Sequence, residues 1–189
     1  MNLKTEIEVF KAINKFNGNV YDSKCKSSLF KCVPIEYYIY DLGWMLIPYS
    51  SKDKYLMEIS NDGFSTFLDK RIQIFFNQDV QLSRKRFTIA HEVGHIICGH
   101  HNTLQKLGHL SNHFNDSLAE QQANIVARNV LVPVRYYNDL IKMTSEEVSK
   151  EFCVSKTMAG YRLSALERDM YMTKLATKAM RGELMVEKR

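Results

Sequence analysis

Apolar side chains repeat with two different periods along the first eighty residues, and each period predicts a different kind of element. Residues 5–16 carry apolar side chains at helical spacing, so the sequence predicts an amphipathic helix that ends at Asn17-Gly18. Pro34 begins a second predicted helix, which continues to Tyr40 and stops at Gly43. Four short apolar runs separated by polar turns then predict strands at residues 44–49, 55–59, 65–68 and 71–76.

From residue 82 onward the apolar positions have the period of helices only. Ser83 is expected to cap a helix that stops near Gly99, and residues 100–115 form a predicted loop rich in His, Asn, Gly and Ser. Further helices are predicted where capping residues precede an apolar period: from Asp116 or Ser117 to about Val130, from the Thr144/Glu147 capping box to Phe152, and from Ser155 to about Met170. Strands followed by helices only indicate an α+β fold.

Length and composition are those of a globular protein without membrane spans. The chain has 189 residues, of which 45% are hydrophobic, and no apolar run approaches the roughly 20 residues of a membrane helix. Its first residues lack the pattern of a secretion signal, and its four cysteines form no Cys-x-x-Cys pair. We therefore expect a cytoplasmic protein with free thiols and no membrane partner. Residues 1–140 are predicted to form the main domain, and residues 141–189 a C-terminal helical segment packed on it.

The strongest chemical signal is the sequence H-E-V-G-H at positions 91–95, inside the predicted helix 83–99. Residues four apart on a helix are rotated by about 40° and displaced by about 6 Å, so both imidazoles leave the same face. Two neutral imidazoles so arranged can bind one Zn²⁺ ion, and Glu92 can reach a water held by that metal without being a ligand. The motif therefore predicts a zinc peptidase with His91 and His95 as ligands and Glu92 as general base.

A catalytic zinc usually takes a third protein ligand, and two residues compete for that position. His101 would fill it in the extended pattern H-E-x-x-H-x-x-G-x-x-H, but that pattern needs a glycine where this chain has Cys98. Glu120 would fill it from the next predicted helix. Asn124 lies four residues later on the same helical face, where its amide oxygen could hold the second ring nitrogen of His91.

A peptide substrate is expected to bind by adding a strand to the edge of the sheet. The strand just before the zinc helix is the candidate edge, and its substrate-binding residues would be Arg71, Ile72, Gln73, Ile74 and Phe75. The alternative is an internal, fully buried strand, because the apolar side chains of this segment do not alternate cleanly.

All six histidines lie between positions 91 and 113, so histidines near the predicted loop are candidates for stabilising the oxyanion of the transition state. The sequence does not choose among the candidates, which are His100, His101, His109, His113, Tyr136, Tyr137 and Tyr161. The polar 100–115 loop is also placed to cover or flank the cleft, so we expect this loop or a partner protein to restrain the activity. The alternative is that the loop is a mobile connector with no role.

Three segments resemble the ImmA/IrrE family of zinc-dependent metallopeptidases: R-F-T-I-A-H-E-V-G-H at 86–95, E-Q-Q-A-N at 120–124 and L-V-P at 131–133. The chain departs from the family pattern at three positions. Gln122 replaces a glutamate, Val126 a phenylalanine and Val132 a methionine. The resemblance implies a gluzincin-like core, in which a small antiparallel or mixed sheet packs on the HExxH helix and on the glutamate-bearing helix, with C-terminal helices following.

In functional terms, the resemblance implies a zinc endopeptidase with Glu92 as general base and one Zn²⁺ held by His91, His95 and Glu120. The best-known family members inactivate a helix-turn-helix repressor of a bacterial genome or mobile element by cleaving it. The implied partner is therefore a protein substrate of that kind.

A DNA- or protein-binding regulator, with a structural or sensory zinc site, is the alternative from a different class. Residues 145–152 and 155–168 could form a helix-turn-helix, and the net charge of +5 is concentrated in the C-terminal tail. The second of these helices offers few polar side chains for reading bases, namely Lys156, Thr157, Arg162 and Ser164. The residues therefore favour the peptidase and make nucleic acid the less expected partner.

Overall fold

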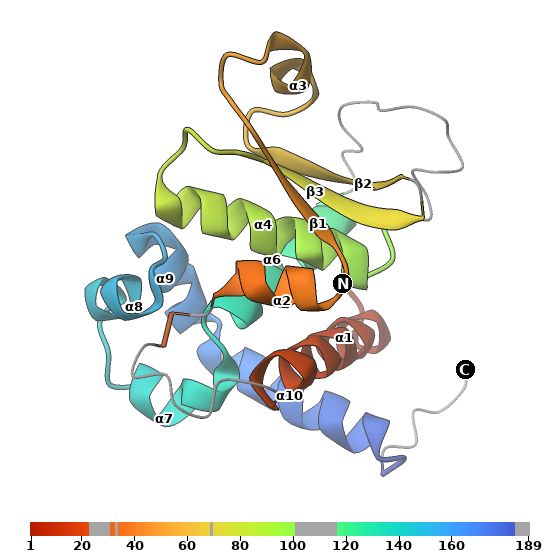
Figure 1. Cartoon of the computed structure of the whole chain (residues 1–189). Coiled ribbons are helices and arrows are strands. Elements are labelled where there is room, and N and C mark those ends of the chain that lie inside the picture. The colour runs from red at the N-terminus through yellow and green to blue at the C-terminus, as the bar shows by residue number, and fades with distance from the viewer. Residues whose placement is uncertain (23–30, 33, 69, 101–116, 184–189) are drawn as a thin grey trace.

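The computed structural model describes residues 1–22, 31–32, 34–68, 70–100 and 117–183, and it confirms the α+β fold (Figure 1). The described elements in chain order are α1 (Leu3–Asp22), α2 (Ile35–Asp41), β1 (Met45–Tyr49), α3 (Lys54–Ile59), β2 (Gly63–Leu68), β3 (Arg71–Asn77), α4 (Leu82–Ile97), α6 (Ser117–Leu131), η1 (Val134–Tyr136), α7 (Tyr137–Leu140), α8 (Ser145–Phe152), α9 (Lys156–Ser164) and α10 (Leu166–Met180).

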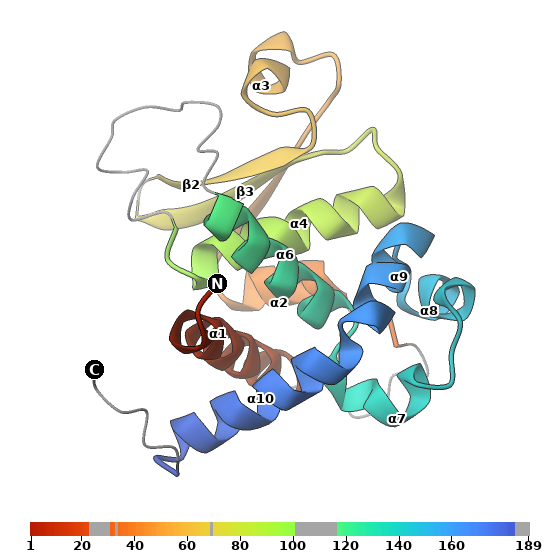
Figure 2. The ribbon, with the colours of Figure 1, turned by 180° about the vertical axis from the view of Figure 1, so that it is seen from behind.

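The molecule is built in layers, which the two opposite views show (Figures 1 and 2). The sheet covers α4, and α6 lies against α4 on the side away from the viewer of Figure 1. A further layer, formed by α1 and α10, closes the other side of this helix pair. The α4 side chains that face inward, among them Ile89 and Val93, are fully buried in the core between these layers. Among the described residues, no helix combines the length and apolar character that a membrane span requires.

The sheet is mixed, and its strand order is β1-β3-β2. The central strand β3 pairs in parallel with β1 and antiparallel with β2. Two parallel strands need a crossover connection, and here the segment containing α3 and β2 supplies it before the chain returns through a hairpin into β3.

This order makes one expectation wrong. The strand with Arg71, Ile72, Gln73, Ile74 and Phe75 is not an edge, because its backbone hydrogen-bonds to a neighbour on both sides. The alternative interpretation, an internal strand, is the one that the structure bears out, with Ile74 fully buried. An incoming peptide has no open edge at β3, whereas β2 pairs with no second strand among the described residues.

The predicted strand at residues 55–59 is also wrong, because this segment forms the helix α3. The carboxylate of Asp53 accepts a hydrogen bond from the backbone N–H of Leu56 at 3.2 Å and so caps the first turn. A short apolar run does not distinguish a strand from a helical turn, and here the capping residue decides.

Several helix ends differ from their predicted positions. The first helix continues past Asn17, whose side-chain amide donates to the backbone oxygen of Asn129 in α6 at 3.2 Å. The helix α4 begins at Leu82, so Ser83 lies inside it instead of capping it. The helix predicted from Ser155 breaks at Ala165 and continues as α10 to Met180, whereas the capping box that opens α8 is confirmed.

The C-terminal helices are joined to α6 by a buried charge cluster. Asp169 of α10 is fully buried and accepts two hydrogen bonds from the Arg128 guanidinium, at 2.7 and 2.8 Å. It also accepts from Asn129 at 2.9 Å and from the fully buried Arg162 of α9 at 3.1 Å. Removing one partner of such a buried ion pair is strongly destabilising, because the remaining charge is left without compensation. The division of the chain at residue 140 stays a prediction.

We predict that Asp169→Asn lowers the free energy of unfolding by roughly 3–5 kcal/mol, because it leaves the buried Arg162 without a counter-charge. Urea denaturation followed by circular dichroism measures the change. The matched control is Glu146→Gln, which breaks the exposed Lys156–Glu146 pair at 3.3 Å and should leave the midpoint nearly unchanged. Equal midpoints for both variants would contradict the structural role of Asp169.

Candidate functional site

The two motif histidines lie one turn apart on α4 and point to the same place. Their Nε2 atoms are 3.0 Å apart, and their side chains are only 16% and 17% exposed for His91 and His95 respectively. The spacing of four residues on a regular helix produces this convergence, as the sequence predicts.

Glu120 approaches the same point from α6. One of its carboxylate oxygens lies 3.2 Å from Nε2 of His91, and the other lies 3.3 Å from Nε2 of His95. The hydrogen bond with His91 lowers the pKa of the Glu120 carboxyl, so it is charged at neutral pH. The three side chains form a group that could hold a metal ion, with one ligand atom from each lying within 4.8 Å of the others.

A glycine, Gly94, lets α4 and α6 approach closely enough for Glu120 to reach the two histidines. A Cβ atom at Gly94 would lie 2.7 Å from Cα and 2.8 Å from the carbonyl oxygen of Ala123. Backbone and Cβ atoms do not come that close in proteins, so a side chain at position 94 would push α6 away from α4. The glycine within the HExxH motif is therefore a requirement for the contact that brings Glu120 to the histidines.

Asn124 lies one turn after Glu120, and its side-chain oxygen is 3.0 Å from Nδ1 of His91. An oxygen acceptor at this position favours, in the neutral ring, the tautomer that carries its proton on Nδ1, which is the form whose Nε2 can bind a metal ion. The structure thus brings together His91 and the amide that the sequence analysis assigned to it.

Glu92 is buried next to the histidines and is held by a residue that sequence reasoning missed. The hydroxyl of Ser65, on β2, donates to Oε2 of Glu92 at 2.5 Å. Desolvation raises the pKa of Glu92 above its usual value, and the hydrogen bond from Ser65 opposes that shift. No pattern around position 65 signals this contact, because it depends on how β2 lies on α4.

His100, one of the candidates for stabilising the oxyanion, contacts His95 instead. Its Nδ1 atom is 2.9 Å from Nδ1 of His95, on the side of that ring opposite Glu120. Its other nitrogen lies 2.7 Å from the side-chain oxygen of Gln122 in α6. His100 therefore supports His95 from behind and does not face the point where the ligand atoms converge.

The tyrosine candidates have other surroundings, and Tyr137 is partly buried against the hydrophobic core. Tyr136 packs edge-on against Phe152 of α8, and its hydroxyl accepts from Arg135. Tyr161 is 70% exposed on α9. The competing ligand His101, the candidates His109 and His113, and the predicted 100–115 loop beyond His100 lie outside the described residues.

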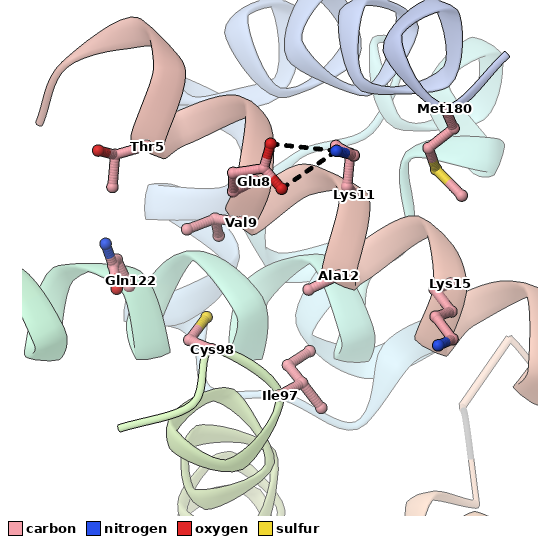
Figure 3. Close-up of a pocket in the computed structure, with 10 residues that line it drawn as sticks. All are labelled: Thr5, Glu8, Val9, Lys11, Ala12, Lys15, Ile97, Cys98, Gln122 and Met180. Carbon is pink, nitrogen blue, oxygen red and sulfur yellow. Dashed lines mark hydrogen bonds and ion pairs between the residues drawn. The ribbon is translucent and has the colours of Figure 1, made fainter. Parts of the chain in front are cut away.

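A pocket of about 430 Å³ lies between α1, the end of α4, α6 and α10 (Figure 3). Gln122 lines it from α6 and Cys98 from the end of α4, whereas His91, His95 and Glu120 do not line it. Burial raises the pKa of the Cys98 thiol to about 11, so this cysteine is protonated at neutral pH and poorly suited to bind a metal.

Comparison with known proteins agrees with the geometry. The peptidase M78 family model, described as an IrrE N-terminal-like domain, matches residues 45–164, which include the sheet, both ligand-bearing helices and the helices through α9. No curated protein matches the chain significantly.

We predict that Gly94→Ala separates α4 from α6 and weakens metal binding, with a loss of about 1–3 kcal/mol in the free energy of unfolding. Chelator competition for the metal and urea denaturation measure the two effects. Gly160→Ala is the matched control, since a Cβ atom there meets nothing within 4 Å and alanine favours the helix α9. Identical behaviour of the two variants would mean that the helix contact does not set the site.

Proposed function

The chain belongs to the peptidase M78 family of IrrE N-terminal-like domains, and from that premise we propose that it is a zinc-dependent endopeptidase with a gluzincin-type core. The observation that carries the proposal is the convergence of His91, His95 and Glu120 beside the buried carboxylate of Glu92. Two imidazoles and one carboxylate, from two helices, are the ligand set of one major class of catalytic zinc sites.

The distances within this group fit a zinc ion. Ligand atoms bound about 2.0–2.1 Å from a tetrahedral metal lie about 3.3 Å from each other. The separations between ligand atoms here are 3.0, 3.2 and 3.3 Å. A tetrahedral ion bound to three residues keeps one position for water or substrate, which is what a catalytic site needs and a structural site lacks.

The chain's own residues then divide the chemistry of peptide hydrolysis. When bound, zinc supplies a Lewis acid that polarises the peptide carbonyl and makes water more acidic. Glu92 takes the proton of the attacking water and delivers it to the leaving nitrogen. Ser65 holds the carboxylate of Glu92 in one orientation through its hydroxyl, and Asn124 does the same for the ring of His91.

The substrate is proposed to bind along β2 and not along β3. A peptide that added to the outer edge of β2 would run past Ser65, which contacts Glu92, and its carbonyl groups would pass the metal ligands. A helix cannot bind in this way, so the cleaved segment of the substrate is expected to be extended when bound.

The substrate class is a regulatory protein, and a helix-turn-helix repressor of a bacterial genome or mobile element is the specific proposal. Its support is the family resemblance of the three motifs. The alternative DNA-binding function loses one of its few candidate base readers, because Arg162 is fully buried and bonded to the backbone of Val132 and to Asp169. No described residue favours nucleic acid over a protein substrate.

We predict that the purified protein holds about one zinc ion per chain, and that His91→Ala and Glu120→Ala lose it because each removes a ligand. Metal analysis after gel filtration measures the content. Gln121→Ala, an exposed neighbour of Glu120 on α6, is the control that should retain zinc. If Glu120→Ala keeps its zinc and His101→Ala loses it, the third ligand is His101.

We predict that Glu92→Gln retains zinc but cleaves at least about 100-fold more slowly, because glutamine cannot accept the proton of water. The assay is incubation of both proteins with the product of the neighbouring gene, followed by mass spectrometry of the fragments. Undiminished cleavage by the variant would refute the general-base role. If the wild-type protein cleaves another protein but no helix-turn-helix repressor, only the proposed substrate is refuted.

A further inference from the structure

The two histidines of the motif are supported in different ways. His91 reaches an amide oxygen directly, through Asn124 at 3.0 Å. His95 reaches one through a second imidazole, because its Nδ1 contacts His100 and His100 in turn contacts Gln122. Each series of contacts ends at an uncharged amide oxygen on α6, and the two amides lie two residues apart.

A left-handed turn at the end of α4 produces the second support. Gly99 has φ +78°, and the backbone N–H groups of Gly99 and His100 donate to the carbonyl oxygens of Ile96 and His95 at 3.0 Å each. These two bonds form a Schellman motif, which brings the chain back over the last helical turn. His100 is thereby attached to His95 twice, once by backbone and once by side chain.

The hydrogen bonds define where the protons lie. The side-chain oxygen of Gln122 can only accept, so Nε2 of His100 carries a proton and donates it. In the neutral ring, Nδ1 of His100 is then an acceptor, and Nδ1 of His95 must be the donor. In a neutral His95 ring this arrangement places the lone pair on Nε2, the atom that faces His91 and Glu120.

We propose that His100 and Gln122 are positioning residues for His95, which select its metal-binding tautomer and hold its ring in the plane that the metal requires. The proposal rests on the zinc site proposed above. Without this support the proton of His95 can move to Nε2, where it excludes a metal, and the ring can rotate away. Residues of this kind change metal affinity by about 10- to 100-fold in other zinc proteins.

The test is the zinc dissociation constant of a set of variants, measured by competition with a chromophoric chelator. His100→Leu removes the acceptor and keeps most of the bulk, and it should weaken zinc binding by about 10- to 100-fold. His100→Asn keeps an acceptor oxygen near the position of Nδ1 and should restore most of the affinity. Circular dichroism with excess chelator checks that each variant folds without metal.

Gln122→Met provides the second, independent measurement, because methionine keeps the length of the buried side chain but offers no strong acceptor. It should weaken zinc binding by about 2- to 10-fold, the net worth of one hydrogen bond. The matched control is Gln121→Met, the same substitution at an exposed neighbouring position on α6, which should bind zinc as the wild type does.

The outcomes separate this proposal from the one on which it depends. If the wild-type protein binds no zinc, the proposed function fails. If the wild type binds zinc and both His100→Leu and Gln122→Met bind it equally tightly, only the positioning role fails. If His100→Asn loses as much affinity as His100→Leu, the effect is one of packing and the hydrogen-bond argument is wrong.

Discussion

The close contact between α4 and α6 at Gly94 and Ala123 is the constraint on which the candidate active site depends. One helix carries the two histidines and the other carries Glu120, and none of these side chains can bind a metal well alone. Because the backbones touch at Gly94, the carboxylate spans the remaining distance with an ordinary side chain. The same contact places Asn124 beside His91, and Gln122 beside His100, which in turn contacts His95.

The rest of the fold keeps α6 in this position. At its C-terminal end, Arg128 and Asn129 are bonded to the buried carboxylate of Asp169, so α10 and α9 hold that end of the helix. Asn17 of α1 bonds to the same turn of α6 from a third direction. The C-terminal helices thus contribute to the orientation of a candidate metal ligand, Glu120, although none of their described side chains belongs to the candidate site. Substitutions at Asp169 and at Gly94 are therefore both expected to change the position of α6 relative to α4.

The sheet contributes differently, through one side chain and one edge. β2 carries Ser65, which orients the buried Glu92, and it also presents the edge on which an extended peptide can add. A single strand therefore sets both the direction of the base and the direction of the proposed substrate. Gly63 at the start of β2 allows this, because a Cβ atom there would lie 2.5 Å from the side chain of Thr88 on α4.

Those features that depend on neighbours along the chain were determined by the sequence itself. The spacing of His91 and His95 on one helical face, the capping box of α8 and the stop at Gly99 are all local, since each needs only a few consecutive residues. Glu120 was within reach of sequence reasoning as one of two candidates, and Asn124 followed from it because the two lie four residues apart on one helix.

The tertiary structure alone decided the features that join distant segments. Ser65 meets Glu92 across 27 positions, and His100 meets Gln122 across 22, so no local pattern marks either pair. The strand order could not be predicted either, because the apolar run of a central strand such as β3 does not differ in sequence from that of an edge strand. Arg162 appeared as a surface residue because the sequence does not show its partners. Its burial is favourable since its guanidinium hydrogen-bonds to Asp169 and to the backbone carbonyl of Val132.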